Sequence, residues 1–158
     1  MHIKAQLENL EIKKPNRAHD NDSGFDLFAP YSFKIKANER ITIPLWVRFE
    51  LKQPLLFKFL NILGVPLRIE AMIRPKSGRS KDGLECSIGT IDFDFRGFVS
   101  CTMHNFSKKT ILIEKQEKLC QIVFMPVFAG EKFQLKIVSN IETSTERGQK
   151  GFGSSGVK

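Results

Sequence analysis

The chain has 158 residues, of which 41% are hydrophobic and 27% are charged, a composition typical of one ordinary globular domain. Twenty-five Lys and Arg residues against seventeen Asp and Glu residues give a net charge of +8, which favours partners that carry negative charge, phosphates among them. The basic residues are scattered and form no long basic arm, so we expect no nucleic-acid partner.

The cysteines and the first residues of the chain bear on its cellular environment. Cys86, Cys101 and Cys120 are odd in number and have no CxxC spacing, and the three histidines lie far apart, so neither a disulfide framework nor a zinc site is predicted. The opening stretch, MHIKAQLENLEIKK, lacks the apolar core of a signal peptide, and no run is long enough to span a bilayer. We therefore expect a reduced, cytoplasmic protein that does not bind membranes.

Alternation of apolar and polar residues predicts strands along most of the chain. From Ile41 to Leu51 every odd position is apolar, which places one face of a strand on a core. The same alternation occurs in residues 67–73 and 133–137, with shorter versions in residues 31–37, 98–104 and 110–114. Turn residues such as Asp82-Gly83 and Ala129-Gly130 separate these runs. Many short strands with polar turns indicate an all-β sandwich or barrel.

One segment breaks the alternation. PLLFKFLNILGVP, residues 54–66, is strongly apolar, and Leu55, Phe59 and Leu63 share helical spacing. We expect a short amphipathic helix that covers one end of the barrel with its apolar face. The alternative is that this face binds a protein partner.

The last residues combine glycines with groups that suit a nucleotide. By itself TERGQKGFGSSG, residues 145–156, is typical of a solvated linker. Its glycines nevertheless let a backbone approach a ligand closely, and Arg147, Ser154 and Ser155 suit phosphate oxygens. Phe152 has no strand neighbours, so its ring is free to cover an external surface such as a nucleobase.

Five blocks in this order resemble the five motifs of the trimeric dUTPases, the deoxyuridine triphosphate nucleotidohydrolases. They are DSGFDLFAP (22–30), RPKSG (74–78), GTIDFDFRGFVSCTMHN (89–105), EKLCQIVFMPV (117–127) and the C-terminal block. The resemblance implies a jelly-roll-like β-barrel over residues 1–140, with the apolar segment 54–66 as an insertion, and a flexible arm over residues 141–158. It also implies Mg²⁺-dependent hydrolysis of dUTP to dUMP and pyrophosphate by in-line attack of water on the α-phosphorus. The family works as a homotrimer, in which motifs one, two and four, motif three, and motif five come from different subunits.

The resemblance assigns a role to each matching residue. Asp92 matches the general base that activates the water, and Asp26 matches the aspartate that reaches Mg²⁺ through water. Phe95 matches the ring that lies against the deoxyribose, and Gly89 and Ser100 match positions of the hairpin that selects uracil. The remaining substrate-binding residues implied in this way are Lys76, Ser77, Gly78, Gln121, Arg147, Gly151, Phe152, Gly153, Ser154 and Ser155.

Four positions depart from the family pattern. Lys76 stands where the family has arginine, so it keeps the charge but not the bidentate fork. Phe95 replaces a common tyrosine and keeps the ring. Ser100 and Gln116 each replace a usual glycine, and the side chain of Ser100 could alter the uracil hairpin.

Two other functions remain open from the sequence. A dCTP deaminase shares this fold and the third motif, but this chain has Thr102 where that family carries its catalytic glutamate. A barrel of the same fold without catalysis could serve as a regulatory or interaction protein, with the segment 54–66 as its docking site.

Overall fold

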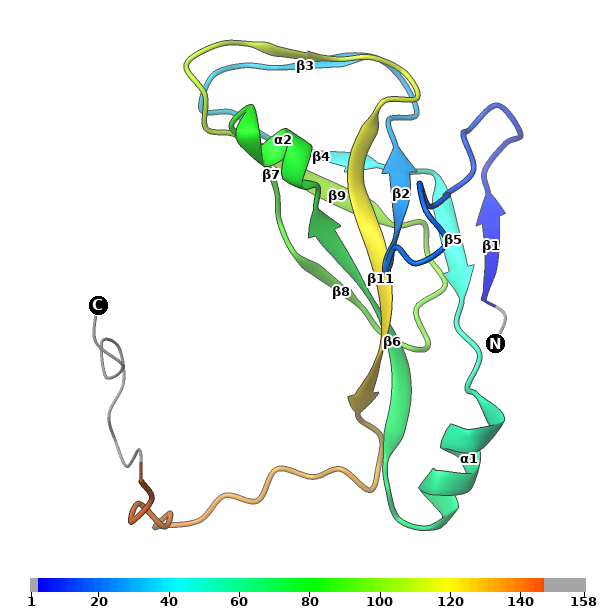
Figure 1. Ribbon diagram of the computed structural model, residues 1–158, viewed down its shortest axis with the longest axis vertical. Coiled ribbons are helices and arrows are strands. Elements are labelled where there is room, and N and C mark those ends of the chain that lie inside the picture. The colour runs from blue at the N-terminus through cyan, green and yellow to red at the C-terminus, as the bar shows by residue number, and fades with distance from the viewer. Residues whose placement is uncertain (1–2, 147–158) are drawn as a thin grey trace.

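The computed structural model describes residues 3–146, and Figure 1 follows the chain from the N-terminus in blue to residue 146 in orange. Within these residues there are eleven strands and two short helices. In chain order they are β1 (Lys4–Leu7), β2 (Gly24–Phe28), β3 (Phe33–Ile35), β4 (Arg40–Pro44), β5 (Val47–Glu50), α1 (Leu55–Ile62), β6 (Leu67–Pro75), α2 (Ser77–Lys81), β7 (Leu84–Cys86), β8 (Gly89–Ile91), β9 (Ser100–Asn105), β10 (Ile111–Ile113) and β11 (Lys118–Phe128).

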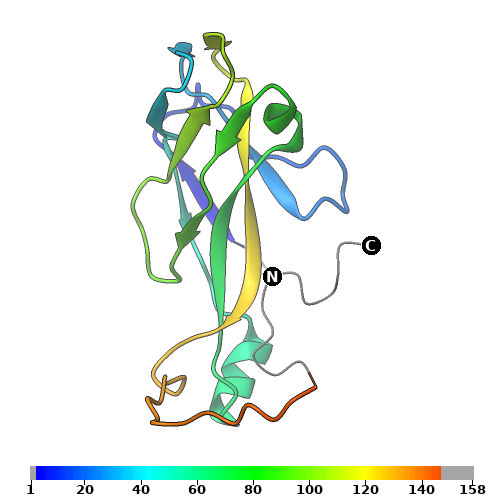
Figure 2. The ribbon, with the colours of Figure 1, turned by 90° about the vertical axis from the view of Figure 1, so that its left-hand side faces the viewer.

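The strands form antiparallel sheets whose neighbours are distant in sequence. A four-stranded sheet has the order β2-β11-β6-β8, and a three-stranded sheet has the order β4-β9-β7. Two further pairs, β1 with β5 and β3 with β10, extend this architecture (Figure 2). No strand pairs with its immediate successor within the described residues, as is usual where sheets are linked by jelly-roll connections. The predicted all-β, jelly-roll-like fold is confirmed.

The core lies between the inward faces of these sheets. The predicted alternation from residue 41 to residue 51 is confirmed, because the side chains at 43, 45, 47, 49 and 51 are all buried. The extended run is interrupted between β4 and β5, where Trp46 has a φ of 53°. Burial of an aliphatic or aromatic side chain stabilises the fold by about 1.5–3 kcal/mol, so this run and its counterpart in β6 contribute much of the stability.

The prediction of a strand over residues 133–137 is wrong, because these residues form no strand in the structure of the single chain. The last strand, β11, ends at Phe128, and the chain continues away from the sheets (Figure 1). Phe133, Leu135 and Ile137 are 59%, 90% and 83% exposed. Alternation alone cannot make a strand, because a strand also needs an edge to pair with and a core to cover, and this segment meets neither within its own chain.

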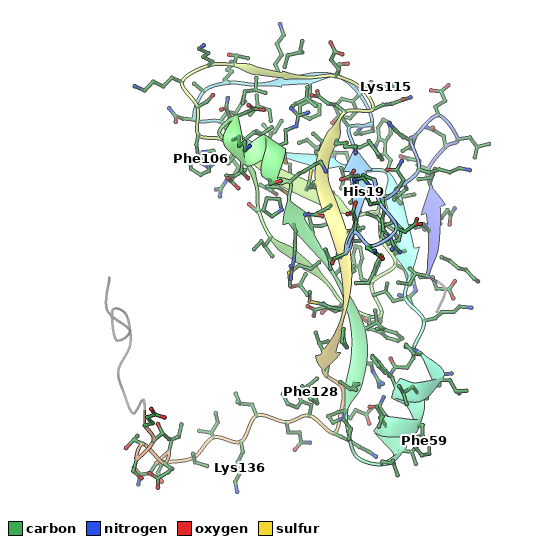
Figure 3. The ribbon with its side chains drawn as sticks, viewed as in Figure 1. His19, Phe59, Phe106, Lys115, Phe128 and Lys136 are labelled. Carbon is green, nitrogen blue, oxygen red and sulfur yellow. The ribbon has the colours of Figure 1, made fainter. Side chains whose placement is uncertain are left out.

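The expected helix forms, but it does not cover the barrel with the expected face. α1 has no buried residue, and Leu55, Phe59 and Leu63 are 82%, 56% and 63% exposed. Phe57 is the residue of α1 that packs against the core. Figures 1 and 3 show α1 with Phe59 at the end of the molecule opposite α2. Neither helix in the described part of the chain is long and apolar enough to cross a membrane.

Candidate functional site

A buried carboxylate held by two lysines lies where β2, β11 and the start of α2 meet. Asp26 on β2 is 5% exposed. Lys76 Nζ lies 2.7 Å from its Oδ1, and Lys118 Nζ lies 2.6 Å from its Oδ2. Burial opposes ionisation of Asp26, but the hydrogen bonds and charges of Lys118 and Lys76 outweigh it and lower the pKa below its ordinary value. The cluster has one negative and two positive charges, so it presents a net positive charge.

Strand register brings these residues together. Asp26 on β2 lies opposite Gln121 on β11, and Gln121 in turn lies opposite Arg74 on β6. Lys118 begins β11, and Lys76 directly follows the last residue of β6. Because antiparallel neighbours fix which residues are adjacent, residues far apart in sequence meet at one end of the sheet.

The amide of Gln121 is held in a defined position. Its Nε2 donates to the carbonyl oxygen of Pro75 at 3.1 Å, which meets the need of a half-buried amide for partners. Its side chain lies over Gly24, where a Cβ would collide with Oε1 of Gln121. A side chain at position 24 would therefore force the Gln121 amide to move from this position.

A second ion pair fixes α2 to β11. Arg79 forms a salt bridge with Glu117, and its Nε donates to the carbonyl oxygen of Lys118 at 3.1 Å. Burial opposes ionisation of Glu117, but Arg79 and a backbone hydrogen bond lower its pKa below the ordinary value. This contact holds the exposed Ser77 and Gly78, the first residues of α2, beside the lysine cluster.

The predicted uracil and base residues line a separate cavity. Gly89, Asp92, Phe95 and Ser100 share a cavity of about 280 Å³, formed by β8, the start of β9 and the loop between them. Asp92 is exposed, and its carbonyl oxygen accepts a hydrogen bond from the Phe95 backbone N–H at 3.1 Å, which closes the turn. A Cβ at position 97 would collide with the ring of Phe95, so Gly97 allows that ring to fold back over the loop.

The structure thus gathers the described candidates into two groups. Asp26, Lys76 and Gln121, with Ser77 and Gly78 beside them, lie around the ends of β2, β6 and β11. Gly89, Asp92, Phe95 and Ser100 form the second group, and among the described residues the lining of their cavity includes no member of the first. The candidates Arg147, Gly151, Phe152, Gly153, Ser154 and Ser155 lie outside the described residues.

Sequence reasoning missed two residues of the first group. Lys118 was given no role, although a charged residue opening an otherwise apolar strand is a usable signal. Gly24 has no signal of its own in the sequence, because only the three-dimensional position of Gln121 shows how close the two residues lie.

The residues around Asp26 do not fit a magnesium ion held by that carboxylate. Both of its oxygens already face lysine ammonium groups, and the net positive charge of the cluster repels a cation. Mg²⁺ prefers carboxylate and phosphate oxygens that are free to coordinate it or its waters. The same charge suits phosphate groups.

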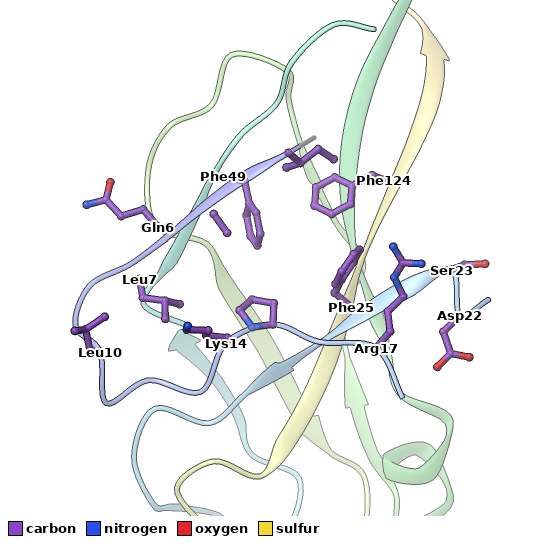
Figure 4. A pocket seen from close by; sticks show the side chains of 13 residues that line it. Gln6, Leu7, Leu10, Lys14, Arg17, Asp22, Ser23, Phe25, Phe49 and Phe124 are labelled. Atoms are coloured by element: carbon purple, nitrogen blue, oxygen red, sulfur yellow. The ribbon is translucent and has the colours of Figure 1, made fainter. Parts of the chain in front are cut away.

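A larger cavity lies elsewhere in the structure, between β1, the loop before β2 and the edge of the four-stranded sheet. It measures about 840 Å³, and Figure 4 shows Phe25, Phe49 and Phe124 projecting into it together. Arg17 covers Phe25, with its guanidinium carbon 4.3 Å from the ring centroid. Its mainly apolar lining contains none of the candidate residues.

Comparison with known proteins gives one consistent answer. The family model described as dUTPase matches residues 10–156. The deoxyuridine 5'-triphosphate nucleotidohydrolase of Clostridium acetobutylicum is 35% identical, and the match covers 96% of this chain and 99% of that relative. The corresponding protein of Hydrogenobaculum is 36% identical, with 91% and 90% covered. The solved dUTPase of Staphylococcus bacteriophage 80alpha with dUPNHPP is 23% identical, has a TM-score of 0.76 and matches over 99% of both chains, which shows the same fold.

Proposed function

Because this chain belongs to the dUTPase family, we propose that it hydrolyses dUTP to dUMP and pyrophosphate. The observation that carries the proposal is the cavity shared by Gly89, Asp92, Phe95 and Ser100, which joins a nucleoside-sized space to an exposed carboxylate. The relatives named above are deoxyuridine triphosphate nucleotidohydrolases, which supports the same substrate.

In this proposal the cavity binds the nucleoside and Asp92 activates water. Gly89 and Ser100 contribute strand backbone groups that pair with the uracil, and the ring of Phe95 packs against the sugar. Asp92 is exposed at the cavity, so a water molecule can reach its carboxylate. A carboxylate ionised at neutral pH can take a proton from that water as the water attacks the α-phosphorus.

The lysine cluster binds the phosphate chain. Lys76 is partly exposed, with 32% of its side-chain surface accessible, so its ammonium can face a phosphate while Asp26 holds it. Ser77 and Gly78 lie next to it at the exposed start of α2 and are available to phosphate oxygens. Asp26 then acts as a positioning residue for Lys76 and Lys118, and Gln121 is kept beside them by Pro75.

We propose that Mg²⁺ enters with the substrate, bound to its phosphate oxygens. Phosphates are common ligands of Mg²⁺, which keeps several waters and needs few protein groups. A dUTPase from phage phi11 of S. aureus coordinates a structural Mg(II) ion, and it shares this fold with a TM-score of 0.71 and 18% identity. Chelation of Mg²⁺ should stop turnover while leaving the fold unchanged by circular dichroism.

We also propose a homotrimer, because one chain keeps the two groups of site residues apart. A shared site would bring the cavity of one subunit to the lysine cluster of another, with Arg147, Gly151, Phe152, Gly153, Ser154 and Ser155 supplied by a third. The exposed apolar residues Leu135 and Ile137 support association, since together they present apolar surface that a subunit contact would cover. Sedimentation equilibrium measures the number of chains in the assembly directly, and we expect three.

The two alternative functions have less support. Thr102 stands at the position of the deaminase glutamate, so no acid is present there to activate water. The hydroxyl of Thr102 is instead hydrogen-bonded to the hydroxyl of Thr42 at 2.9 Å. A purely regulatory barrel would not need the cavity and the carboxylate that this chain retains.

Asp92→Asn tests the proposal. The wild-type protein with Mg²⁺ should release pyrophosphate from dUTP well above dTTP, dCTP and UTP. The substitution should lower kcat by at least about 10²-fold, since a general base contributes about 10²–10⁴-fold, with little change in dUTP affinity. Asp94→Asn, an exposed carboxylate two residues away, is the matched control and should stay active. Equal turnover of all four nucleotides, or full activity of Asp92→Asn, would contradict the proposal.

A further inference from the structure

The three cysteines of the chain meet in its core, although their spacing predicted no metal site. Cys86, Cys101 and Cys120 are 5%, 2% and 0% exposed, and their Sγ atoms all lie within 4.8 Å of one another. They are the cysteines of the whole sequence, so every thiol of the protein belongs to this cluster.

Strand pairing explains the convergence. Cys86 on β7 lies opposite Met103 on β9, and Cys101 is two residues before Met103, on the same face of that sheet. Cys120 lies on β11 of the other sheet, opposite Pro75. The cluster therefore joins two sheets across the core, and sequence spacing could not show it because three separate strands contribute.

The donor set is soft and contains only sulfur. Among the described residues this is the one place where three potential metal-ligating side chains bring their ligand atoms so close, and no imidazole or carboxylate belongs to it. Thiolates select soft ions such as Cu(I) and Zn(II), whereas Mg²⁺ and Ca²⁺ require oxygen. A structural zinc ion normally has four protein ligands, and the buried cluster offers three thiols.

The spacing also suits a single ion. An ion at the centre of an equilateral triangle with 4.8 Å sides would lie about 2.8 Å from each sulfur, against about 2.3 Å for a zinc–thiolate bond. Because 4.8 Å is an upper limit, the sulfur–sulfur distances have to shorten by at most about 0.8 Å, to about 4.0 Å, for three bonds of about 2.3 Å. Cys86 and Cys101 lie on paired strands and Cys120 faces them, so small side-chain rotations supply this movement.

We propose that Cys86, Cys101 and Cys120 form a three-coordinate site for one soft, thiophilic metal ion, of which Cu(I) is the type. All three thiols lose their protons to solvent as the ion binds, because a cysteine binds a metal as its thiolate, and three Cu–S bonds form. The copper stays Cu(I) throughout, so no oxidant or reductant is consumed.

Titration of the intact, reduced protein with Cu(I) tests the site. The titration is anaerobic and contains a competing Cu(I) chelator, so that only specific binding is measured. One Cu(I) should bind per chain, X-ray absorption should show three sulfur neighbours, and the melting temperature should rise because the ion binds the folded state. Zn(II), which would lack a fourth protein ligand, should bind at least tenfold more weakly.

Removal of one sulfur should abolish tight binding. Cys101→Ala and Cys120→Ala each leave two thiols, and both should lose at least about tenfold in Cu(I) affinity and the rise in melting temperature. Val99→Ala, which also shortens a buried side chain but keeps all three thiols, is the matched control and should bind as the wild type does. If either cysteine variant unfolds, Cys86→Ser takes its place.

Several results would overturn the proposal. They are absence of binding to the folded protein, binding that lowers the melting temperature, and equal binding by wild type and cysteine variants. Each would show that the three thiols act only as small buried apolar groups.

Discussion

At the scale of single residues, one buried carboxylate holds the two lysines that we propose bind the phosphate chain. Asp26 fixes the positions of the Lys76 and Lys118 ammonium groups, because each of its two carboxylate oxygens forms an ion pair with one of them. A lysine lacks the rigid fork of arginine, so its position has to be fixed by its partner. The departure at Lys76 is therefore compensated by the paired carboxylate rather than by a different cation.

Asp26→Asn should weaken both stability and substrate binding. The substitution removes two ion pairs, and since the lysine side chains are 32% and 40% exposed we expect a loss of about 1–3 kcal/mol, less than for a fully buried pair. The KM for dUTP should rise as Lys76 loses its fixed position. Denaturant unfolding and steady-state kinetics measure the two effects, and Asp20→Asn, at an exposed loop residue, is the control. An unchanged KM would show that the carboxylate does not position the lysines.

The same carboxylate predicts an acid-sensitive contribution to stability. The folded-state pKa of Asp26 lies below its unfolded value of about 3.9, so its contribution is complete above that value and is lost as pH falls through the folded pKa. The difference in unfolding free energy between wild type and Asp26→Asn should be constant from pH 7 to about pH 5 and shrink below pH 4. A difference that instead grows on acidification would contradict the ion-pair geometry.

A turn glycine that this chain lacks supplies another residue-scale prediction. Gln116 stands where the family usually has glycine, and its φ is 67°, in the left-handed region that costs a non-glycine residue about 1–2 kcal/mol. Gln116→Gly should relieve this strain and, after the greater unfolded-state entropy of glycine, stabilise the protein by up to about 1 kcal/mol. Thermal unfolding measures it. Destabilisation would mean that the Gln116 side chain makes contacts that outweigh the strain.

At the scale of elements, the alternation of apolar and polar residues correctly predicted those strands that find a partner strand within their own chain. The strands of residues 31–51, 67–73 and 98–114 form where apolar residues alternate, because each finds both a partner strand and the core. Residues 133–137 have the same pattern and form no strand, since the required edge is missing from their own chain. The motifs predicted separate roles for Asp92, Gly89 and Ser100, and the structure places these residues in one cavity. Lys118 and the three-cysteine cluster could not be predicted, because they depend on register between distant strands.

Helix α1, formed by the insertion, is a second element whose packing could not be predicted from residue spacing, and two substitutions test that packing directly. Helical spacing predicted α1 but could not tell which side faces the barrel, and Phe57 rather than Leu55, Phe59 and Leu63 contacts the core. Phe57→Ala should therefore destabilise the protein by about 1–3 kcal/mol, whereas Leu55→Ala should change stability by less than about 0.5 kcal/mol. Denaturant unfolding of the two variants decides between the faces. Equal losses of stability in the two variants would mean that the face of α1 with Leu55, Phe59 and Leu63 also packs against the barrel.

At the scale of the whole molecule, one chain keeps the two groups of candidate site residues apart. The cavity lined by Gly89, Asp92, Phe95 and Ser100 and the lysine cluster are both present, but no described residue belongs to both. The net charge of +8 favours a triphosphate as ligand, and the exposed apolar residues after β11 favour association. A site shared between subunits explains these features together.

Complementation between two inactive variants tests most directly whether each site is shared between subunits. Asp92→Asn removes the base of the cavity group, and Ser77→Ala removes a phosphate-binding hydroxyl of the other group, so each variant alone should hydrolyse dUTP far more slowly than the wild type. When equal amounts are unfolded and refolded together, about a quarter of the sites of a randomly mixed trimer should draw both groups from unaltered positions. We predict recovery of about a quarter of wild-type dUTP hydrolysis; a mixture no more active than its separate components would contradict the shared site.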